Sequence, residues 1–360
     1  MKSLSSHRPR LLALLEAASQ GRQDLCLASF AVAQVQWAIE TGIGPLLCHT
    51  TRADPYAALT HSWPLLRSAD LTARMLSADQ IDAMREIIEV CKGYVPPLTL
   101  LKGISIGEQY YPAPHLRVMA DLDVLVEEAA RPAMEARLYG LGYRQQSPHP
   151  PAFYATHHHS MPFFHPHRGI WVEVHRGLVS PYSLVGGDPI FGQAHLRSQL
   201  RLSTFQGESV RRLSPELQIV YITTHWAQSF TVIGGMVALL DLIYLLQQTR
   251  EAVCWERLLD WVTGSATATY LYLLLTYLAT SQLIDIAPAI LQDLGGRQRT
   301  FGPRSLHLVH RLIDQYLVDG RAFGRACSAR NVKVLWQSLL WPGPPWCNLM
   351  RALWHLIWPG

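Results

Sequence analysis

The stretch RVMADLDVLV, residues 117–126, sets two carboxylates one residue apart in a segment that otherwise has the pattern of a buried β-strand. Because strand side chains alternate between faces, Asp121 and Asp123 project from one face and the intervening apolar residues from the other. Two like charges this close raise each other's pKa unless a positive charge lies between them, and a divalent cation bound through oxygen would supply it. The alternative is structural: Asp121 caps or ends the strand, and Asp123 pairs with a nearby arginine such as Arg117.

A third carboxylate lies in a second apolar strand pattern, GIWVEVHRG at residues 169–177, where Glu173 stands between two valines. If this strand pairs beside the first, three carboxylates meet on one face of a sheet. Such a set could bind two magnesium ions and clamp a triphosphate for in-line attack. Taken alone, Glu173 fits an exposed residue of an edge strand equally well.

Composition limits the classes of protein to consider. The 360 residues are 49% hydrophobic and 16% charged, which predicts a globular chain of two or three packed units. The net charge of +4 comes mostly from scattered arginines, so it gives no argument for a nucleic-acid partner. Six cysteines without short spacings, and no signal peptide, predict a cytoplasmic protein. The apolar stretch 230–246 contains Asp241, and we expect a buried helix there and no transmembrane segment.

Hydrophobic periodicity divides the chain into an N-terminal helical region (1–95), an α/β core (96–212) and a C-terminal helical region (213–360). Helices are expected to end at Gly42, Gly93 and Gly142, and one to begin with Ser214 and Pro215. The fold class predicted is mixed α+β: a small mixed β-sheet flanked by N-terminal helices and a C-terminal helical bundle. The Trp- and Pro-rich stretch 335–360 is expected to pack on that bundle or to touch a partner or membrane surface.

Several short motifs, taken in order, resemble the uncharacterised bacterial nucleotidyltransferase family within the DNA polymerase beta-like superfamily. These motifs are LLKG (100–103), Arg117, DLDVLV (121–126), LGY (141–143) and VEVH (172–175). Members of that family often accompany gene clusters for peptide natural products, including lasso peptides. The resemblance implies a nucleotidyltransferase-like core in which Asp121, Asp123 and Glu173 are catalytic ligands of Mg²⁺ or Mn²⁺ and a nucleoside triphosphate (NTP) is the donor.

The resemblance also implies nucleotide-binding roles for Lys102, Gly103 and Arg117. The superfamily usually has Gly-Gly or Gly-Ser near the phosphates, where this chain has Lys102 and Gly103. Gly103 would let the backbone approach phosphate, the following helix would direct its N-terminus at the anion, and the two basic side chains would add charge. Each basic residue also has a structural alternative: Lys102 only neutralises Asp123, or Arg117 only pairs with Asp121.

Histidine is unusually frequent, with 16 in the chain and a cluster at 157, 158, 159, 165, 167 and 175. A zinc site is one hypothesis, but the run 157–159 is expected to point its side chains in alternating directions, which disfavours it. We expect His159 and His175 to border the carboxylates as accessory groups that hydrogen-bond acids or phosphate and assist proton transfer. In the C-terminal region His225 and Asp241 are further accessory candidates, with structural pairing as the favoured interpretation.

The function predicted is that of a cytoplasmic, magnesium-dependent enzyme that transfers a nucleoside monophosphate from an NTP to an unknown acceptor. That acceptor would be a ribosomally made peptide natural product or a small molecule. Three alternatives stay open: a non-catalytic module on the same fold that binds a peptide or partner protein, transfer of another phosphorylated or sugar group, and a histidine-based zinc hydrolase.

Overall fold

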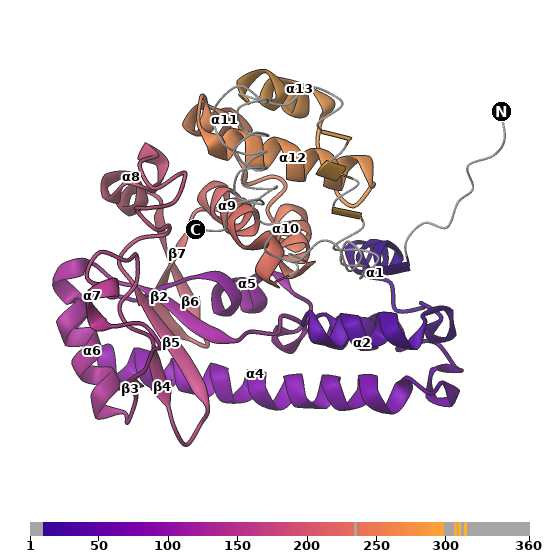
Figure 1. The fold of residues 1–360 in the computed structure, drawn as a ribbon, viewed down its shortest axis with the longest axis horizontal. Coiled ribbons are helices and arrows are strands. Elements are labelled where there is room, and N and C mark those ends of the chain that lie inside the picture. Colours follow the sequence, from indigo (N-terminus) through magenta and orange to yellow (C-terminus); the bar gives the residue numbers. More distant parts are fainter. Residues whose placement is uncertain (1–9, 234–235, 299–305, 308, 311–312, 315–360) are drawn as a thin grey trace, which may run out of the picture. The chain divides into compact units, whose positions relative to one another are not determined.

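The computed structural model describes residues 10–233, 236–298, 306–307, 309–310 and 313–314 (Figure 1). The stretch 335–360, for which packing on the bundle or a surface contact was expected, lies outside these residues. The chain forms two compact units, one from 1–69 with 222–360 and one from 70–221, and each is described by itself. The three-part division with limits at 95 and 212 stays a prediction.

The first unit is helical in its described part. Its helices are α1 (Arg10–Ser19), α2 (Val32–Glu40), α3 (Gly44–Thr50), α10 (Met236–Gln248), α11 (Trp255–Val262), α12 (Ala266–Thr280) and α13 (Pro288–Arg297). Helices α10 and α12 are apolar around most of their circumference and are buried along nearly their whole length. Such helices form the core of a bundle. No helix of the described part of the chain is both long and apolar enough to span a membrane.

Two helices, α4 (Trp63–Cys91) and α9 (Pro215–Ile233), contribute residues to both units. The predicted helix boundaries are confirmed at four places. Gly42, Gly93 and Gly142 follow helix ends with φ of +81°, +76° and +96°, a left-handed conformation that glycine adopts without steric cost. Pro215 is the first residue of α9, and the Ser214 side chain accepts a hydrogen bond from the Leu217 amide.

The second unit contains a seven-stranded mixed sheet with the order β3-β4-β5-β2-β1-β7-β6. Its strands are β1 (Thr99–Leu100), β2 (Asp121–Leu125), β3 (Arg144–Gln145), β4 (Phe163–His165), β5 (Ile170–His175), β6 (Leu200–Phe205) and β7 (Glu208–Leu213). The pairs β2–β5 and β1–β7 are parallel, and the other pairs are antiparallel. Helices α5 (Lys102–Tyr110), α6 (Arg131–Gly140), α7 (Pro151–Tyr154) and α8 (Gln193–Ser198) complete the unit. The predicted mixed α+β fold is confirmed.

The two faces of the central strands differ sharply in polarity. On one face apolar side chains from β1, β2 and β5 pack with α4 and α6; they are Leu100, Leu122, Val124, Val172 and Val174. Alternation therefore places Asp121 and Asp123 of β2, and Glu173 and His175 of β5, on the opposite face. The acidic residues consequently lie in an apolar strand without entering the hydrophobic core.

The hairpin of β6 and β7 was not identified among the strand patterns of the sequence. Its two-residue turn, Gln206 and Gly207, has φ of +51° and +86°, which suits the tight turns that join antiparallel strands. Most side chains of β6 are at least partly exposed, so the strand lacks the apolar alternation that signals a half-buried strand.

Candidate active site

The parallel pairing of β2 and β5 brings two of the three candidate carboxylates, Asp123 and Glu173, within ligand distance of each other, and Asp121 is not part of that group. Asp123 lies directly opposite Glu173 in the register, and Leu125 opposite His175. Ligand atoms of Asp123, Glu173 and His175 all lie within 4.8 Å of one another. Because β5 lies between β4 and β2, the interpretation of Glu173 as an edge-strand residue is wrong. We call Asp121, Asp123, Glu173 and His175 the carboxylate centre; their catalytic and metal-binding roles stay predictions.

Asp123 is the most fully paired member of this centre. Its side chain is 2% exposed, and its Oδ1 atom accepts hydrogen bonds from Lys102 Nζ at 2.8 Å and from His175 Nε2 at 2.7 Å. Burial alone would raise the pKa of Asp123, but the charges of Lys102 and His175 outweigh it and lower the pKa. Burial likewise opposes charge on Lys102 and His175, yet their contacts with Asp123 raise both pKa values. Lys102 therefore neutralises Asp123, as its structural alternative requires, and a further role of Lys102 toward nucleotide stays a prediction.

Asp121 contrasts with Asp123 because it has no hydrogen-bond or ion-pair partner among the described residues. The charge of Asp123, together with burial, raises the pKa of Asp121 to about 7, and Lys102 opposes the shift only partly. Arg117 does not pair with it; one guanidinium nitrogen, Nη1, donates to the Val118 carbonyl at 2.7 Å. The alternative that made Arg117 the structural partner of Asp121 is wrong, and within the described part of the chain Asp121 is a carboxyl without a hydrogen-bond or ion-pair partner, under the charge of Asp123 and Glu173.

Glu173 lies between the two accessory histidines. Its Oε2 atom is 3.4 Å from His175 Nε2 and 3.9 Å from His159 Nε2. Burial would raise the pKa of Glu173, but the hydrogen bond with His175 lowers it. The Nδ1 atom of His159 must donate to the Ser160 carbonyl, 2.7 Å away, which leaves Nε2 of the neutral ring as an acceptor. His159 and His175 thus border the carboxylates, while their part in proton transfer stays a prediction.

Lys102 and Gly103 occupy the turn where the superfamily resemblance places glycine. Lys102 has φ of +44°, so this turn keeps a left-handed backbone despite the side chain. A Cβ atom added to Gly103 would lie 2.5 Å from Met119 Cγ and 3.3 Å from Arg117 Nη1. A side chain at position 103 would therefore force the Met119 side chain to move. Whether Lys102, Gly103 and Arg117 bind nucleotide is not decided by these contacts and stays a prediction.

A buried arginine that sequence reasoning missed fixes α5 to the sheet. Arg212 of β7 forms an ion pair with Glu108 at 2.5 Å and donates to the carbonyls of Ser105, at 2.7 Å, and Thr204, at 3.0 Å. Its side chain is 2% exposed. No signal in the sequence singled out Arg212 among the three charged residues of the unassigned run ESVRRL. These bonds hold the helix whose first residue, Lys102, contacts Asp123.

The remaining accessory candidates belong to the other compact unit. His225 of α9 and Asp241 of α10 belong to the first unit, where Asp241 is buried and His225 is half-buried. The carboxylate centre belongs to the second unit. Accessory roles for His225 and Asp241 therefore stay predictions.

A second group of ligand-type side chains, the histidine loop, consists of His157, His158 and His159. The expectation that these side chains diverge is wrong, because His157 and His158 lie in a bend and only His159 forms an isolated β-bridge, with His175. The ring centroid of His157 lies 4.3 Å from that of His158 and 4.3 Å from that of His159, and the centroids of His158 and His159 are 4.8 Å apart. Burial, aided by neighbouring histidines, lowers the pKa of His157 to about 4 and that of His158 to about 2. Both imidazoles are therefore neutral at pH 7.

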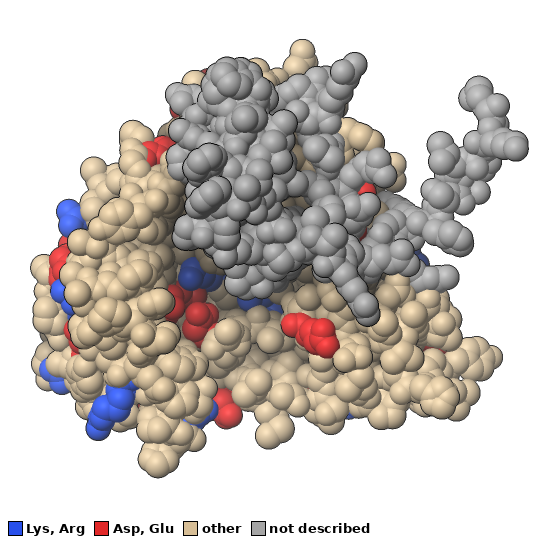
Figure 2. All heavy atoms as spheres, viewed as in Figure 1, with Lys and Arg blue, Asp and Glu red and all other residues tan. Residues whose placement is uncertain are grey.

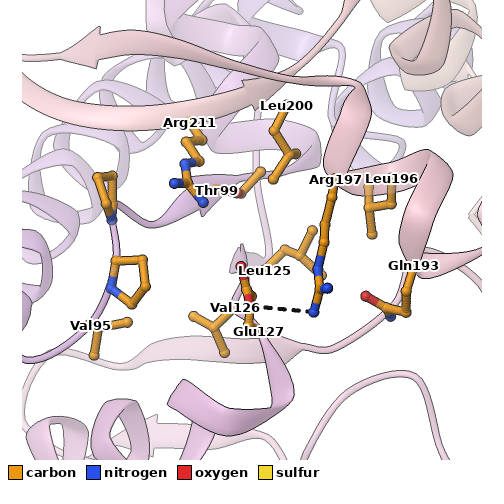
Figure 3. A pocket seen from close by; sticks show the side chains of 12 residues that line it. Val95, Thr99, Leu125, Val126, Glu127, Gln193, Leu196, Arg197, Leu200 and Arg211 are labelled. Atoms are coloured by element: carbon orange, nitrogen blue, oxygen red, sulfur yellow. Dashed lines mark hydrogen bonds and ion pairs between the residues drawn. The ribbon is translucent and has the colours of Figure 1, made fainter.

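A narrow hollow lies further along the strand face that carries Asp121 and Asp123. Leu125, two residues after Asp123, is part of its wall, with Thr99 of β1 and side chains from α8 and β7 (Figure 3). Arg197 is directed toward Glu127, at 3.3 Å, whereas the Arg211 side chain makes no hydrogen bond or ion pair within the described part of the chain. The hollow combines apolar walls with cationic groups at its rim.

The surface drawn in Figure 2 shows isolated basic side chains interspersed with acidic ones, and no continuous basic patch on the coloured part of that face. Across the described residues several basic groups are paired with acids, for example Arg131 with Glu128 at 2.9 Å and with Glu135 at 3.1 Å. This distribution agrees with the scattered arginines of the sequence.

Comparisons with known proteins give one match. The family described as uncharacterised nucleotidyltransferase matches residues 33–281, more than half of the chain and inclusive of β2 and β5. Neither the curated proteins nor the solved structures searched contain a match to the chain.

Proposed function

We propose a reaction for this chain on the premise that it belongs to the uncharacterised nucleotidyltransferase family. The reaction is transfer of a nucleoside monophosphate from an NTP to an acceptor, with Mg²⁺ or Mn²⁺ as the metal. The observation that carries the proposal is the Asp121 carboxyl, which has no partner among the described residues and lies on one face of the sheet with Asp123 and Glu173. A folded protein keeps carboxyl groups crowded in this way at a cost, and a bound cation would remove that cost.

The donor set fits a hard divalent cation. Asp121, Asp123 and Glu173 offer carboxylate oxygens, the ligands that Mg²⁺ prefers together with water and substrate phosphate. The pKa of Asp121, raised to about 7 mainly by the charge of Asp123, reports uncompensated negative charge at this place. When bound, the metal would neutralise charge on the triphosphate and on the phosphoryl group being transferred.

The chain's own residues would position the reactants. His175 donates to Asp123 Oδ1 and so fixes the orientation of that carboxylate. Lys102, 20% exposed, supplies a positive charge next to the carboxylates, and we propose that it attracts the triphosphate together with Arg117 and the N-terminus of α5. The Arg212 contacts with Glu108 and Ser105 keep α5 in register with the sheet while substrates exchange.

For the acceptor we propose a ribosomally made peptide natural product, with a small molecule as the alternative class, and the cytoplasm as the site of reaction. The resemblance to a family found beside peptide gene clusters supports the peptide. The hollow that begins at Leu125 could seat an apolar acceptor segment that carries an acidic group, because Arg211 has no competing partner within the described residues.

The test is a thermal-shift screen of the four common NTPs and of sugar nucleotides, each with and without Mg²⁺ or Mn²⁺. A ligand that binds the folded state raises the melting temperature of the protein, and the rise grows with the ratio of ligand concentration to Kd. We expect an NTP to raise it only when the metal is present, and Asp121→Asn to remove this rise. The matched control is Asp82→Asn, which replaces an exposed carboxylate of α4 paired with Arg85. This variant should keep the metal-dependent rise in melting temperature. A shift by sugar nucleotides alone would instead indicate transfer of another group.

A second candidate function rests on the ion pair of Lys102 with Asp123. An ammonium group 2.8 Å from Asp123 Oδ1 already supplies positive charge at a predicted metal ligand. This observation favours a fold that has lost catalysis and binds a peptide or partner protein. The screen separates the two candidates, because a pure binding module would show no metal-dependent shift with any nucleotide.

A further inference from the structure

We propose that His157, His158 and His159 form a binding site for one divalent transition-metal cation of the zinc class. The site is separate from the carboxylate centre, and the proposal does not depend on the reaction proposed above. It assigns the histidine loop a metal-binding role without assigning it hydrolysis.

The positions of the ring nitrogens carry the proposal. Each of the three rings offers one nitrogen, and these three nitrogens all lie within 4.8 Å of one another. In a tetrahedral zinc site with Zn–N distances of about 2.0–2.1 Å, the ligand nitrogens are about 3.4 Å apart. Small rotations of the imidazole rings would bring the three nitrogens to this separation.

Unsatisfied polar atoms give an independent indication. The Nδ1 atoms of His157 and His158 are buried and have no hydrogen-bond partner among the residues that the structure describes. The same is true of Nδ1 of His175, a fully buried side chain whose ring centroid is 5.3 Å from those of His158 and His159. Buried polar nitrogens without partners are uncommon and costly, and coordination of a cation would satisfy those of the loop.

The loop is held rigidly in place. Arg176, directly after β5, donates from Nε to the His157 carbonyl at 2.6 Å and from Nη2 to the carbonyls of Tyr154 and Ala155. The Arg176 amide donates to the His158 carbonyl at 2.9 Å, and the Ser160 amide to Val174 at 2.9 Å. A loop fixed on both sides of its histidines loses little conformational entropy when they coordinate a metal.

Donor chemistry separates the two sites. Neutral imidazole nitrogens suit Zn²⁺, Co²⁺, Ni²⁺ and Cu²⁺, whereas Mg²⁺ takes oxygen ligands. Glu173 Oε2 lies 3.9 Å from His159 Nε2, but in this proposal Glu173 stays a ligand of the carboxylate centre. Three histidines alone would leave the fourth position to water or to a ligand.

The experiment measures metal binding directly. Zinc is titrated into the full-length protein in competition with a chromophoric chelator, and Co²⁺ binding is followed by its visible absorption bands. We expect one Zn²⁺ per chain, a four-coordinate Co²⁺ spectrum, and no displacement by excess Mg²⁺. His157→Gln and His158→Gln should each weaken zinc affinity at least about tenfold, since even loss of a group behind a ligand costs about 10- to 100-fold.

His167→Gln is the matched control because this histidine is exposed and lies in the turn between β4 and β5. The zinc affinity of this variant should stay within about twofold of that of the wild type. Circular dichroism shows whether His158→Gln folds. If it does not, His157→Gln still tests the proposal, because His157 is less buried and its replacement disturbs the fold less. Absence of stoichiometric zinc binding, or equal weakening by all three variants, would overturn the proposal. Asp121→Asn should keep zinc binding while losing the nucleotide shift, so failure of one site is distinguishable from failure of the other.

Discussion

The carboxylate centre and the histidine loop lie side by side in one unit, but they are built on opposite electrostatic principles. In the carboxylate centre, charged groups are crowded on two regular strands, and Lys102 and His175 compensate part of the charge. In the histidine loop the rings are neutral, two of their nitrogens lack hydrogen-bond partners within the described part of the chain, and an irregular backbone is held by Arg176. The first arrangement favours a hard cation through negative charge, and the second a softer cation through uncharged donors.

The largest expected effect comes from the fully paired member of the carboxylate centre. Asp123→Asn removes the counter-charge of Lys102 and His175 at a site 2% exposed, and the loss of one partner of a buried pair costs about 3–5 kcal/mol. We expect the metal-free melting temperature to fall by roughly 6–20 °C. Asp121→Asn, on the same strand face, is the control and should not lower it. Equal melting temperatures for the Asp123 variant and the wild type would show that the ion pair is not structural.

Lys102 allows a finer division between charge and backbone. Lys102→Ala leaves the buried Asp123 with one partner fewer, which we expect to destabilise the metal-free protein by about 1–3 kcal/mol. Lys102→Gly should be less harmful by roughly 1–2 kcal/mol, because a left-handed residue with a side chain carries that cost at φ of +44°. Denaturant titration measures the free energy of unfolding of both variants, and Lys92→Ala, a change at an exposed lysine, is the control. A glycine variant less stable than the alanine variant would contradict the backbone argument.

The carboxylate centre was predictable because strand alternation is a strong local rule. A period of two in DLDVLV and WVEVH was enough to place three acids on one face once the strands paired. The mixed α+β fold and the helix ends at Gly42, Gly93 and Gly142 followed from equally local signals. The partner of Asp123 was not predictable: Lys102 and Arg117 were both open candidates, and only the tertiary position of α5 decided for Lys102.

A pH experiment sharpens the contrast between Asp121 and the histidines. The pKa of Asp121 rises to about 7 in the folded state, so the proton stabilises the metal-free fold fully below about pH 4. This stabilisation is lost as the pH rises through 7. We expect the wild-type melting temperature, relative to that of Asp121→Asn, to fall between pH 5 and pH 8 in the presence of a chelator. Parallel curves for the two proteins would show that Asp121 does not titrate in this range.

The smallest expected effect concerns the histidine loop. Arg176→Met removes the side-chain bonds to the carbonyls of Tyr154, Ala155 and His157 without touching a ring. We expect zinc affinity to drop about tenfold, as for other changes behind a metal ligand, with a small change in melting temperature. Arg197→Met, an exposed arginine paired with Glu127, is the control. Unchanged zinc affinity in the Arg176 variant would mean that the loop does not need this support.

The histidine loop shows where sequence reasoning fails. Three consecutive histidines diverge on a strand, and only a bend brings their rings together, but no local pattern in THHHS predicts a bend of this kind. The contacts of Arg176 with the loop join residues about 20 positions apart, and those of Arg212 with α5 join residues more than 100 apart. Side chains that act over such separations are visible only once the sheet is assembled.

The central claim is that Asp121, Asp123 and Glu173 bind a divalent cation together with a nucleotide. Isothermal titration of the best NTP from the screen into the wild type and into Asp121→Asn, each with and without Mg²⁺, tests it most directly, because Asp121 has no structural partner to lose within the described residues. We predict binding to the wild type that requires Mg²⁺, and affinity reduced at least about tenfold in the variant, a difference of about 1.4 kcal/mol. Equal affinities of the two proteins in the presence of Mg²⁺ would contradict the claim.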